Sequence, residues 1–271
     1  MRILQLSDIH FGSVYDSQFS SIDHFTAVLD ATKDIPVDAV VVTGDLADDG
    51  KLSSYVWLLD RIQENYGTAI PVLVTPGNHD DRAAMWTAYS EFVLNKTWRE
   101  RVDMHGTFNK PGQFLARLGK TDKYGEYDHD IVVMDNGHME HPYEALCRLK
   151  VEYPNIIGGY FLFVHMPVLR PFHLFMNDPS RTIADDENVF ASALVTSGCS
   201  AIFCGHYHCE SHESSFGMDQ YAAPALQVQI DPFTETCNPS GNYPGYSLIV
   251  DRGPVAVKTA YVLPMSMENT K

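Results

Sequence analysis

Five short segments rich in Asp, Asn and His each follow directly on an apolar stretch of this 271-residue chain. The apolar stretches are short and rich in Val, Ile, Leu and Phe, which is typical of strands buried on both faces of a sheet. Side chains that follow such strands meet at one edge of the sheet, where binding sites are commonly built. The segments are Asp8-Ile9-His10, Gly44-Asp45, Gly77-Asn78-His79-Asp80, His165 and Gly205-His206-Tyr207-His208. The pattern predicts a layered α/β fold with its chemistry in the loops after the strands.

The hydrophobic pattern predicts the elements that connect these segments. Continuous apolar runs predict strands at residues 2–7, 39–43, 71–75, 131–135, 160–165 and 201–204. Apolar residues at helical spacing predict helices at about 19–29, at 53–67 with Ser53 as the cap, from Asp81 to about 92, and from Asp185 to Gly198. Residues 95–128 are expected to form loops with a short hairpin or two. From about residue 211 the pattern indicates antiparallel strands, and we expect one domain over residues 1–271.

The residue types in the five segments are those that bind transition metals. They supply two Asp, one Asn and four His, in addition to His79, and imidazole with carboxylate suits Zn²⁺, Mn²⁺ and iron. Seven ligands are too many for one ion with an open position, but they suit two ions that share a bridging carboxylate. Two such ions hold a phosphate oxygen and lower the pKa of a bridging water, which then attacks phosphorus in line. A histidine that binds no metal can protonate the leaving alkoxide.

The same segments resemble those of the calcineurin-like metallophosphoesterases. They occur in the family's order, with His165 shortly before Pro167, and the resemblance extends to at least His208. The stretch Pro76–Arg82, with residues 3–8 and 43–47, is similar to the branch of class III cyclic-nucleotide phosphodiesterases and glycerophosphodiesterases. The resemblance implies a four-layer α/β/β/α sandwich with mixed sheets.

The resemblance also divides the seven ligands into two sets and one shared residue. The first metal would be held by Asp8, His10 and His208. The second would be held by Asn78, His165 and His206, and Asp45 would bridge the two ions.

The remaining motif residues would act on the substrate. His79 would contact the scissile phosphate and protonate the leaving group, and Asp80 would orient His79. Asn78 and Arg82 are further candidates for substrate binding. Arg82 is equally well placed to pair with Asp81 or another acid.

Two features differ from other branches of the family. The protein Ser/Thr phosphatase branch has Gly-Asp-x-x-Asp-Arg-Gly and ends its third motif in Glu, whereas here Leu-Ala-Asp-Asp follows Asp45 and the third motif ends in Asp80. Many members have two successive histidines in the fourth motif, whereas Met166 follows His165 here. The first difference argues against the phosphatase branch, and the second leaves the ligand set complete while changing the mouth of the site.

A second metal site can be drawn from neighbouring residues. Cys204, His206, His208 and Cys209 together have the residue types of a structural zinc site. However, Cys204 belongs to a predicted strand, and the chain has no Cys-x-x-Cys pair. The two-metal site is therefore the favoured interpretation.

Charge and composition exclude several classes of partner. The net charge is −16 and no basic run occurs, which argues against binding to the nucleic-acid backbone. The five cysteines are an odd number in a chain that is not small, which indicates reduced thiols. No apolar run reaches the roughly 20 residues of a membrane span, and the N-terminus leads directly into a strand. We expect a cytoplasmic protein that binds neither nucleic acid nor membrane.

Together these features predict hydrolysis of a small phosphodiester by a metal-bridging hydroxide, with two divalent ions (Mn, Fe or Zn) as cofactors. A 3′,5′-cyclic nucleotide is the first expected substrate and a glycerophosphodiester the second. A phosphomonoesterase or nucleotide pyrophosphatase is an alternative, because the same core serves all of them. A non-catalytic metal-binding scaffold is the alternative of another class, although such a protein is expected to have lost ligands. The resemblance also makes a homodimer an expectation, with residues 243–263 as a candidate interface.

Overall fold

The computed structural model describes most of the chain. The described residues are 1–13, 20–101, 113–121, 127–136, 159–170, 172–177, 187–241 and 243–263. All five segments that carry the predicted ligands lie within these ranges.

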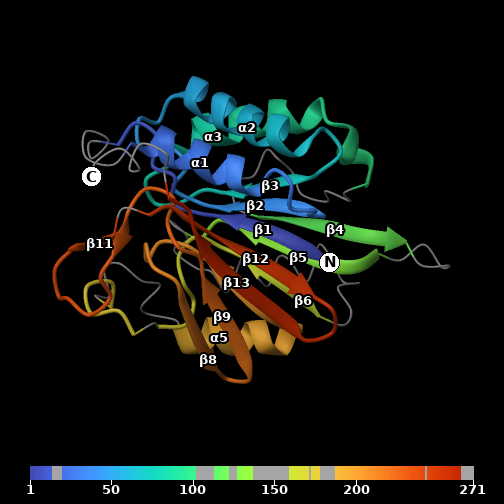
Figure 1. Cartoon of the computed structure of the whole chain (residues 1–271). Helices are drawn as coiled ribbons and strands as arrows, with labels where there is room; N and C mark the ends of the chain where they lie inside the picture. The colour runs from blue at the N-terminus through green and yellow to red at the C-terminus, as the bar shows by residue number, and fades with distance from the viewer. Residues whose placement is uncertain are drawn as a thin grey trace.

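The described helices and strands form four layers (Figure 1). Three helices cover the outer face of a five-stranded sheet: α1 (Ser21–Thr32), α2 (Leu52–Tyr66) and α3 (Arg82–Leu94). A six-stranded sheet packs beneath it, and α5 (Glu187–Ser197) covers the far face of that sheet. This α/β/β/α order confirms the predicted fold class.

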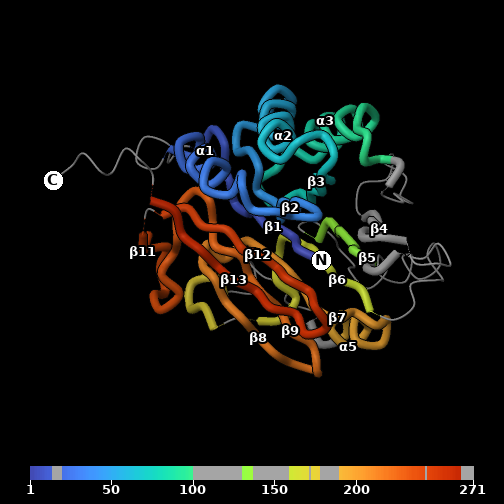
Figure 2. Tube along the Cα trace, turned by 45° about the vertical axis from the view of Figure 1, so that its right-hand side comes forward, coloured from blue at the N-terminus to red at the C-terminus, as the bar shows by residue number. Residues whose placement is uncertain are grey.

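The first sheet combines strands from both ends of the chain in the order β13-β12-β1-β2-β3. The bounds are β1 (Arg2–Leu6), β2 (Ala39–Thr43), β3 (Val72–Thr75), β12 (Gly245–Asp251) and β13 (Val255–Tyr261). β1, β2 and β3 are parallel, and helices α1 and α2 supply the crossover connections that parallel strands need, whereas β12 is antiparallel to β1. In Figure 2, β12 and β13 (red) therefore run beside β1 (blue).

The second sheet has the order β4-β5-β6-β7-β9-β8. The bounds are β4 (Gln113–Thr121), β5 (Tyr127–Met134), β6 (Tyr160–Phe163), β7 (Cys199–Cys204), β8 (Ser211–Ser215) and β9 (Met218–Ala222). The four central strands are parallel, and the two edge strands are antiparallel to their neighbours. A separate short pair consists of β10 (Gln229–Ile230) and β11 (Pro239–Gly241).

One hydrophobic core joins the two sheets. It includes Val41 from β2 together with Phe161, Phe163 and Phe203 from β6 and β7. The buried side chain of Gln5 crosses this core, because its Nε2 donates to Thr43 Oγ1 (3.1 Å) in the first sheet and to the carbonyl of Cys204 (2.9 Å) in the second. The sheets are therefore held in a fixed relation, which places the ends of β1, β2, β6 and β7 on the same side of the molecule.

Local signals explain most helix ends. Asp81 caps α3 by accepting a hydrogen bond from the Ala84 amide (2.9 Å), as predicted. Gly67 ends α2 with φ 82°, which a glycine adopts without strain. The prediction that Ser53 caps α2 was wrong. The cap residue is Lys51, whose side chain makes no capping bond.

Three other expectations on the fold have mixed outcomes. Within residues 95–128 the structure has the short 3-10 helix η1 (Thr97–Arg101) and the antiparallel hairpin of β4 and β5, whereas residues 102–112 and 122–126 lie outside the described ranges. The predicted start of the last helix at 185–186 also lies outside them. The C-terminal strands are not wholly antiparallel, because β9 pairs in parallel with β7.

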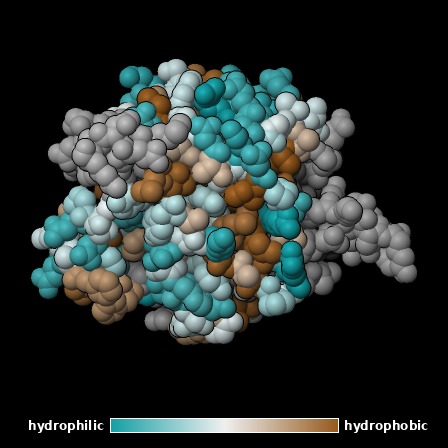
Figure 3. Space-filling model, in the orientation of Figure 1, coloured by the Kyte–Doolittle hydropathy of each residue, from teal (hydrophilic) through white to brown (hydrophobic). Residues whose placement is uncertain are grey.

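The C-terminal hairpin forms part of one open face. In Figure 3, hydrophobic residues gather in the middle of this face, over β12 and β13. Leu248, Val255 and Val257 there are half-buried against the core, while Tyr261 and Leu263 are exposed. A homodimer through residues 243–263 remains a prediction.

In the described part of the chain, no helix is both long and apolar enough to cross a bilayer.

Candidate metal centre

The loops that follow five strands meet at one edge of the two sheets. The loop after β1 carries Asp8 and His10 and is tied to the loop after β2, since Asp8 N donates to Gly44 O (3.1 Å) and His10 N to Asp45 O (2.9 Å). In the second sheet, Gly205 N after β7 donates to the carbonyl of His165 after β6 (3.0 Å). All seven predicted ligands lie at this edge, and six are buried; Asn78 is half-buried.

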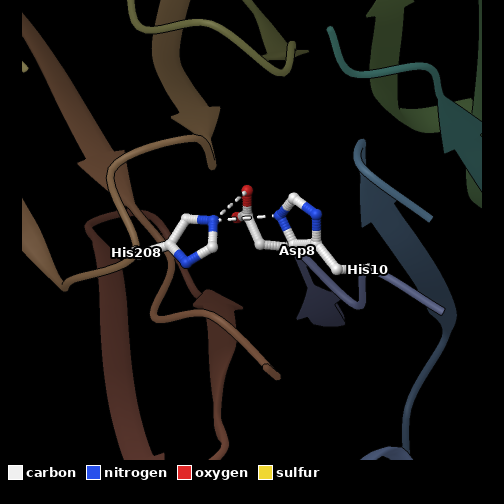
Figure 4. A group of neighbouring side chains, drawn as sticks. All are labelled: Asp8, His10 and His208. Atoms are coloured by element: carbon white, nitrogen blue, oxygen red, sulfur yellow. Dashed lines mark hydrogen bonds and ion pairs between the residues drawn. The ribbon is translucent and has the colours of Figure 1, made fainter. Parts of the chain in front are cut away.

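Asp8, His10 and His208 form the first group, and their side chains point toward one another (Figure 4). The Nε2 atoms of the two histidines are 3.0 Å apart. His208 Nε2 lies 3.5 Å from Asp8 Oδ1. The group is completed across the two sheets, since Asp8 and His10 follow β1 whereas His208 follows β7.

The Nδ1 atom of each ring, on the side away from the other ring, indicates what the two Nε2 atoms can bind. His208 Nδ1 donates to the carbonyl of Val228 (2.9 Å), and His10 Nδ1 faces Asp48 Oδ1 (2.7 Å). In the neutral rings both hydrogens are therefore on Nδ1, and the two Nε2 lone pairs face each other. Two acceptors at 3.0 Å repel unless a cation or a proton lies between them. Metal-binding histidines show this arrangement, with the second ring N–H given to an oxygen.

Asp45, His165 and His206 form the second group. His165 Nδ1 donates to Thr43 O (2.8 Å), which leaves Nε2 to face Asp45 Oδ2 at 3.3 Å and Asn78 Oδ1 at 3.0 Å. In the neutral form of His165 these three atoms are again acceptors that face one another. The donor set therefore fits a second cation.

Asp45 lies between the two groups. Its Oδ2 is 3.5 Å from His10 Nε2 and 3.3 Å from His165 Nε2. Its Oδ1 accepts a hydrogen bond from the His79 amide (2.9 Å). A carboxylate in this position can contribute a ligand oxygen to both groups at once.

The backbone at the site is strained. Among the described residues, six non-glycine residues have positive φ, and five of these belong to the predicted ligands: Asp8 (55°), His10 (51°), Asp45 (50°), His206 (72°) and His208 (53°). Such conformations cost of order 1–3 kcal/mol each and persist where the surroundings impose them, commonly at functional sites. The strained backbone conformations are therefore concentrated at the edge of the sheets where the predicted ligands meet.

Two glycines allow the ligand loops to approach each other. A Cβ on Gly77 would collide with the side chain of Asp45, and one on Gly205 would collide with Ser7 and Asp8. Both contacts involve a predicted ligand or its neighbour. Glycine is required at these positions because a side chain would displace a ligand carboxylate.

Electrostatics at the edge favour positive charge. Burial opposes protonation of His10, but its hydrogen bond to Asp48 and the charges of Asp45, Asp48 and Asp8 outweigh it and raise the pKa of His10 to about 9. Burial likewise opposes protonation of His165, but Asp45 raises its pKa to about 9. Burial lowers the pKa of His208, and the charge of His10 adds to this effect. The carboxylates thus create a negative potential at this edge, and that potential favours the binding of a cation.

His79 stands at the exposed side of the centre. Its side chain is 50% exposed, and its Nδ1 lies 3.4 Å from Asp48 Oδ1. The hydrogen bond to Asp48 raises the pKa of His79, against the effect of burial. His79 is therefore close to the ligands and reachable from solvent, and the Asp48 carboxylate favours the protonated form of its ring.

The carboxylate of Asp80 binds the backbone of two ligand loops. Both of its oxygens accept backbone hydrogen bonds, Oδ1 from Leu46 and Ala47 (2.9 and 3.0 Å) and Oδ2 from Gly77 (2.8 Å). Asp80 therefore fastens the loop after β3 to the loop after β2, and the carboxylate beside the His79 ring is that of Asp48.

Asp48 was not identified from the sequence. It contacts both His10 and His79, and these contacts lower its pKa despite its burial. The signal was present, because Asp48 follows Asp45 by three residues, as the second Asp does in Gly-Asp-x-x-Asp. The Arg-Gly that completes that motif is absent here, because Asp49 and Gly50 follow Asp48.

The guanidinium of Arg82 binds the carboxylate of Asp135. Its Nε and one terminal nitrogen bind Asp135 Oδ2 and Oδ1 at 2.8 and 2.9 Å, and both side chains are largely buried. The partner is not Asp81, and it lies at the end of a strand rather than on a helix surface. This two-bond contact occupies the edge of the guanidinium that best fits a phosphate.

The alternative zinc site with two cysteines is not supported. Cys204 is buried and its Sγ donates to Tyr221 O (3.6 Å). In the described ranges, three groups of side chains bring possible ligand atoms within 4.8 Å of one another, and none of the three includes a cysteine.

Comparison with known families agrees with this geometry. The family model described as calcineurin-like phosphoesterase matches residues 1–210. The chain belongs to that family. A relative from Fibrobacter succinogenes, described as a probable cyclic nucleotide phosphodiesterase, is 28% identical over 238 residues, which cover 86% of this chain and 82% of that protein.

Solved structures share the family fold at low identity. A dimetal phosphatase from Danio rerio has a TM-score of 0.59 and 10% identity, covering 97% of this chain and 99% of its own. GAP50 of Plasmodium, described as the anchor in the inner membrane complex, has a TM-score of 0.60 and 14% identity, covering 96% and 84%. At this identity the two similarities show the fold alone.

Proposed function

We propose that this family member is a dinuclear metal-dependent hydrolase of small phosphodiesters. The observation that carries the proposal is the pair of acceptor groups that share Asp45, with His10 on one side of its Oδ2 and His165 on the other. The nitrogen and oxygen donors of each group fit one cation.

The residues that would hold the ions follow from the two groups. Asp8, His10 and His208 would hold the first and Asn78, His165 and His206 the second, with Asp45 common to both. Two such ions, when bound, act as Lewis acids on a phosphoryl oxygen and generate a nucleophile from water at neutral pH. Nitrogen and carboxylate ligands of this kind suit manganese, iron or zinc.

His79 is proposed to protonate the leaving group. Its ring lies next to His10, with 4.9 Å between ring centroids, and half of the side chain is open to solvent. Asp48 holds the ring and favours its protonated form. A proton on the imidazole is therefore available to a departing alkoxide, and Asn78 and His79 would also contact the phosphate.

We infer a preference for diesters over monoesters. The guanidinium of Arg82 is bound by Asp135 through two hydrogen bonds, so it does not supply a free positive charge for the second negative charge of a phosphomonoester. We place 3′,5′-cyclic nucleotides first, as the name of the Fibrobacter succinogenes relative suggests, and glycerophosphodiesters second.

A substrate panel tests the proposal. The full chain loaded with Mn²⁺ is assayed on bis(p-nitrophenyl) phosphate, p-nitrophenyl phosphate, 3′,5′-cyclic AMP and glycerophosphoethanolamine. We expect chelator-sensitive hydrolysis of the diesters, loss of it in Asp45→Asn, and retention in Asp38→Asn, whose carboxylate only accepts from the Arg2 amide (2.7 Å) away from the site.

Each other outcome has a distinct meaning. Hydrolysis of the monoester alone would replace the diesterase with a phosphomonoesterase on the same site. Metal binding without turnover of any substrate would favour a metal-binding scaffold.

A further inference from the structure

Three consecutive residues at the end of β5 connect the loop that carries Asn78 with the loop that carries His165, two of the proposed ligands of the second metal. Met134, Asp135 and Asn136 are all buried, at 0%, 6% and 3% exposure. None of them was singled out as a ligand. Each makes a hydrogen bond or ion pair to one of the two loops.

Met134 and Asp135 reach the loop that carries Asn78. Thr75, the last residue of β3, donates from Oγ1 to the carbonyl of Met134 (2.9 Å), which joins the first sheet to the second. Asp135 then binds Arg82 through two bonds of 2.8 and 2.9 Å. The segment from Thr75 to Arg82 is therefore fixed at both of its ends by β5.

Asn136 reaches the loop that carries His165. Its Oδ1 accepts from the Met166 amide (2.9 Å), and its Nδ2 donates to the Met166 carbonyl (2.5 Å). The side-chain amide thus satisfies both backbone groups of the residue directly after the ligand. β6 ends at Phe163, so this bond pair holds the chain where the strand no longer does.

We infer that Asp135 and Asn136 are positioning residues for the second metal, because they hold the Asn78 loop and His165 against the same strand end. The His165 Nε2 to Asn78 Oδ1 distance of 3.0 Å depends on these connections, since the two ligands follow strands of different sheets. The ligands of the first group instead follow β1 and β7. The inference rests on the dinuclear site of the proposed function.

A selective loss of one ion distinguishes positioning from general destabilisation. In Asn136→Ala, both backbone groups of Met166 lose their partners, and His165 is free to shift. Loss of residues that orient ligands typically lowers metal affinity about 10–100-fold. We expect that loss for the second ion only, with the first ion bound as in the unchanged protein.

The experiment is a Mn²⁺ titration of the metal-free full chain by calorimetry, followed by electron paramagnetic resonance. We expect the signal of an exchange-coupled pair in the unchanged protein and that of an isolated ion in Asn136→Ala at the same Mn²⁺ concentration. Asn65→Ala is the matched control, because Asn65 ties α2 to the Leu29 carbonyl (3.0 Å) away from the site. It should lower the melting temperature without changing the two affinities.

A second variant keeps the test valid if Asn136→Ala does not fold. Asn136→Asp retains the acceptor for the Met166 amide but places a carboxylate oxygen against the Met166 carbonyl, so the same selective loss is expected. Two unchanged affinities in a folded Asn136 variant, or equal weakening of both, would overturn the inference. If the unchanged protein itself binds fewer than two ions, the proposed function fails instead.

Discussion

The Nε2 atoms of His10 and His208 lie 3.0 Å apart, although 198 positions separate the residues in the chain. The Nδ1 atom of each ring faces an oxygen acceptor, so in the neutral rings the two Nε2 lone pairs are directed at each other. Both residues also have positive φ angles, and the two sheets hold their loops in this arrangement. A cation between the rings would remove the repulsion between the two lone pairs.

Metal loading should stabilise the fold. Ions that bind only the folded chain add about 2.7 kcal/mol to the free energy of unfolding at a free concentration 100 times Kd. We expect Mn²⁺ to raise the melting temperature in thermal unfolding and a chelator to reverse the rise. A melting temperature that is the same with Mn²⁺ and with chelator would contradict a tightly bound pair.

Gly77→Ala should abolish binding of both ions. A Cβ at this position collides with Asp45, which contacts both groups. Gly67→Ala is the control, because its φ of 82° strains an alanine but nothing lies within 4 Å of the added Cβ. The control should lose stability, by about 1–3 kcal/mol, and keep both ions. Equal metal content in the two variants, measured by elemental analysis, would show that the close approach at Gly77 is unimportant.

Asp48→Asn should weaken the first metal about 10–100-fold, since the carboxylate orients His10 through a 2.7 Å contact. The same change should slow turnover, because Asp48 also lies beside His79. Asp49→Asn tests the neighbouring carboxylate, which binds Lys51 and Ser54 instead. If both variants bind Mn²⁺ equally well in a titration, Asp48 does not support the centre.

His79→Ala should lose activity in proportion to how much the leaving group needs a proton. A general acid contributes typically 10²–10⁴-fold, so turnover of alkyl diesters should fall by that order while turnover of bis(p-nitrophenyl) phosphate falls much less. Metal content should stay unchanged, because the His79 ring belongs to neither of the two proposed ligand sets. Equal losses on both kinds of ester in steady-state assays would argue against the acid role.

The strand ends could be predicted because buried strands and ligand residues have strong local patterns. β2 was predicted at residues 39–43, where it occurs, and β3 begins one residue later than expected, at Val72 rather than Pro71. The cap of α3 at Asp81 was predictable because an Asp at a helix start bonds its own backbone. At α2 the helix already begins at Leu52, so Ser53 and Ser54 lie within its first turn, and Ser54 gives its hydroxyl to Asp49.

Long-range pairing could not be predicted in the same way. A strand was predicted at residues 247–251, but only the folded chain shows that β12 joins β1 at the other end of the sequence. The contact between Arg82 and Asp135 is also long-range, since the two residues are 53 positions apart in the chain. The role of Asp48 depends on the distance to His10 and His79 in space, which motif spacing alone does not give.

A metal titration coupled to turnover tests the central claim most directly. Metal-free protein is titrated with Mn²⁺ while bound ions per chain and hydrolysis of bis(p-nitrophenyl) phosphate are followed together. The shared position of Asp45 predicts two ions per chain, with hydrolysis rising as the second ion binds. Saturation at one ion, or two bound ions without hydrolysis, would contradict a dinuclear phosphodiesterase.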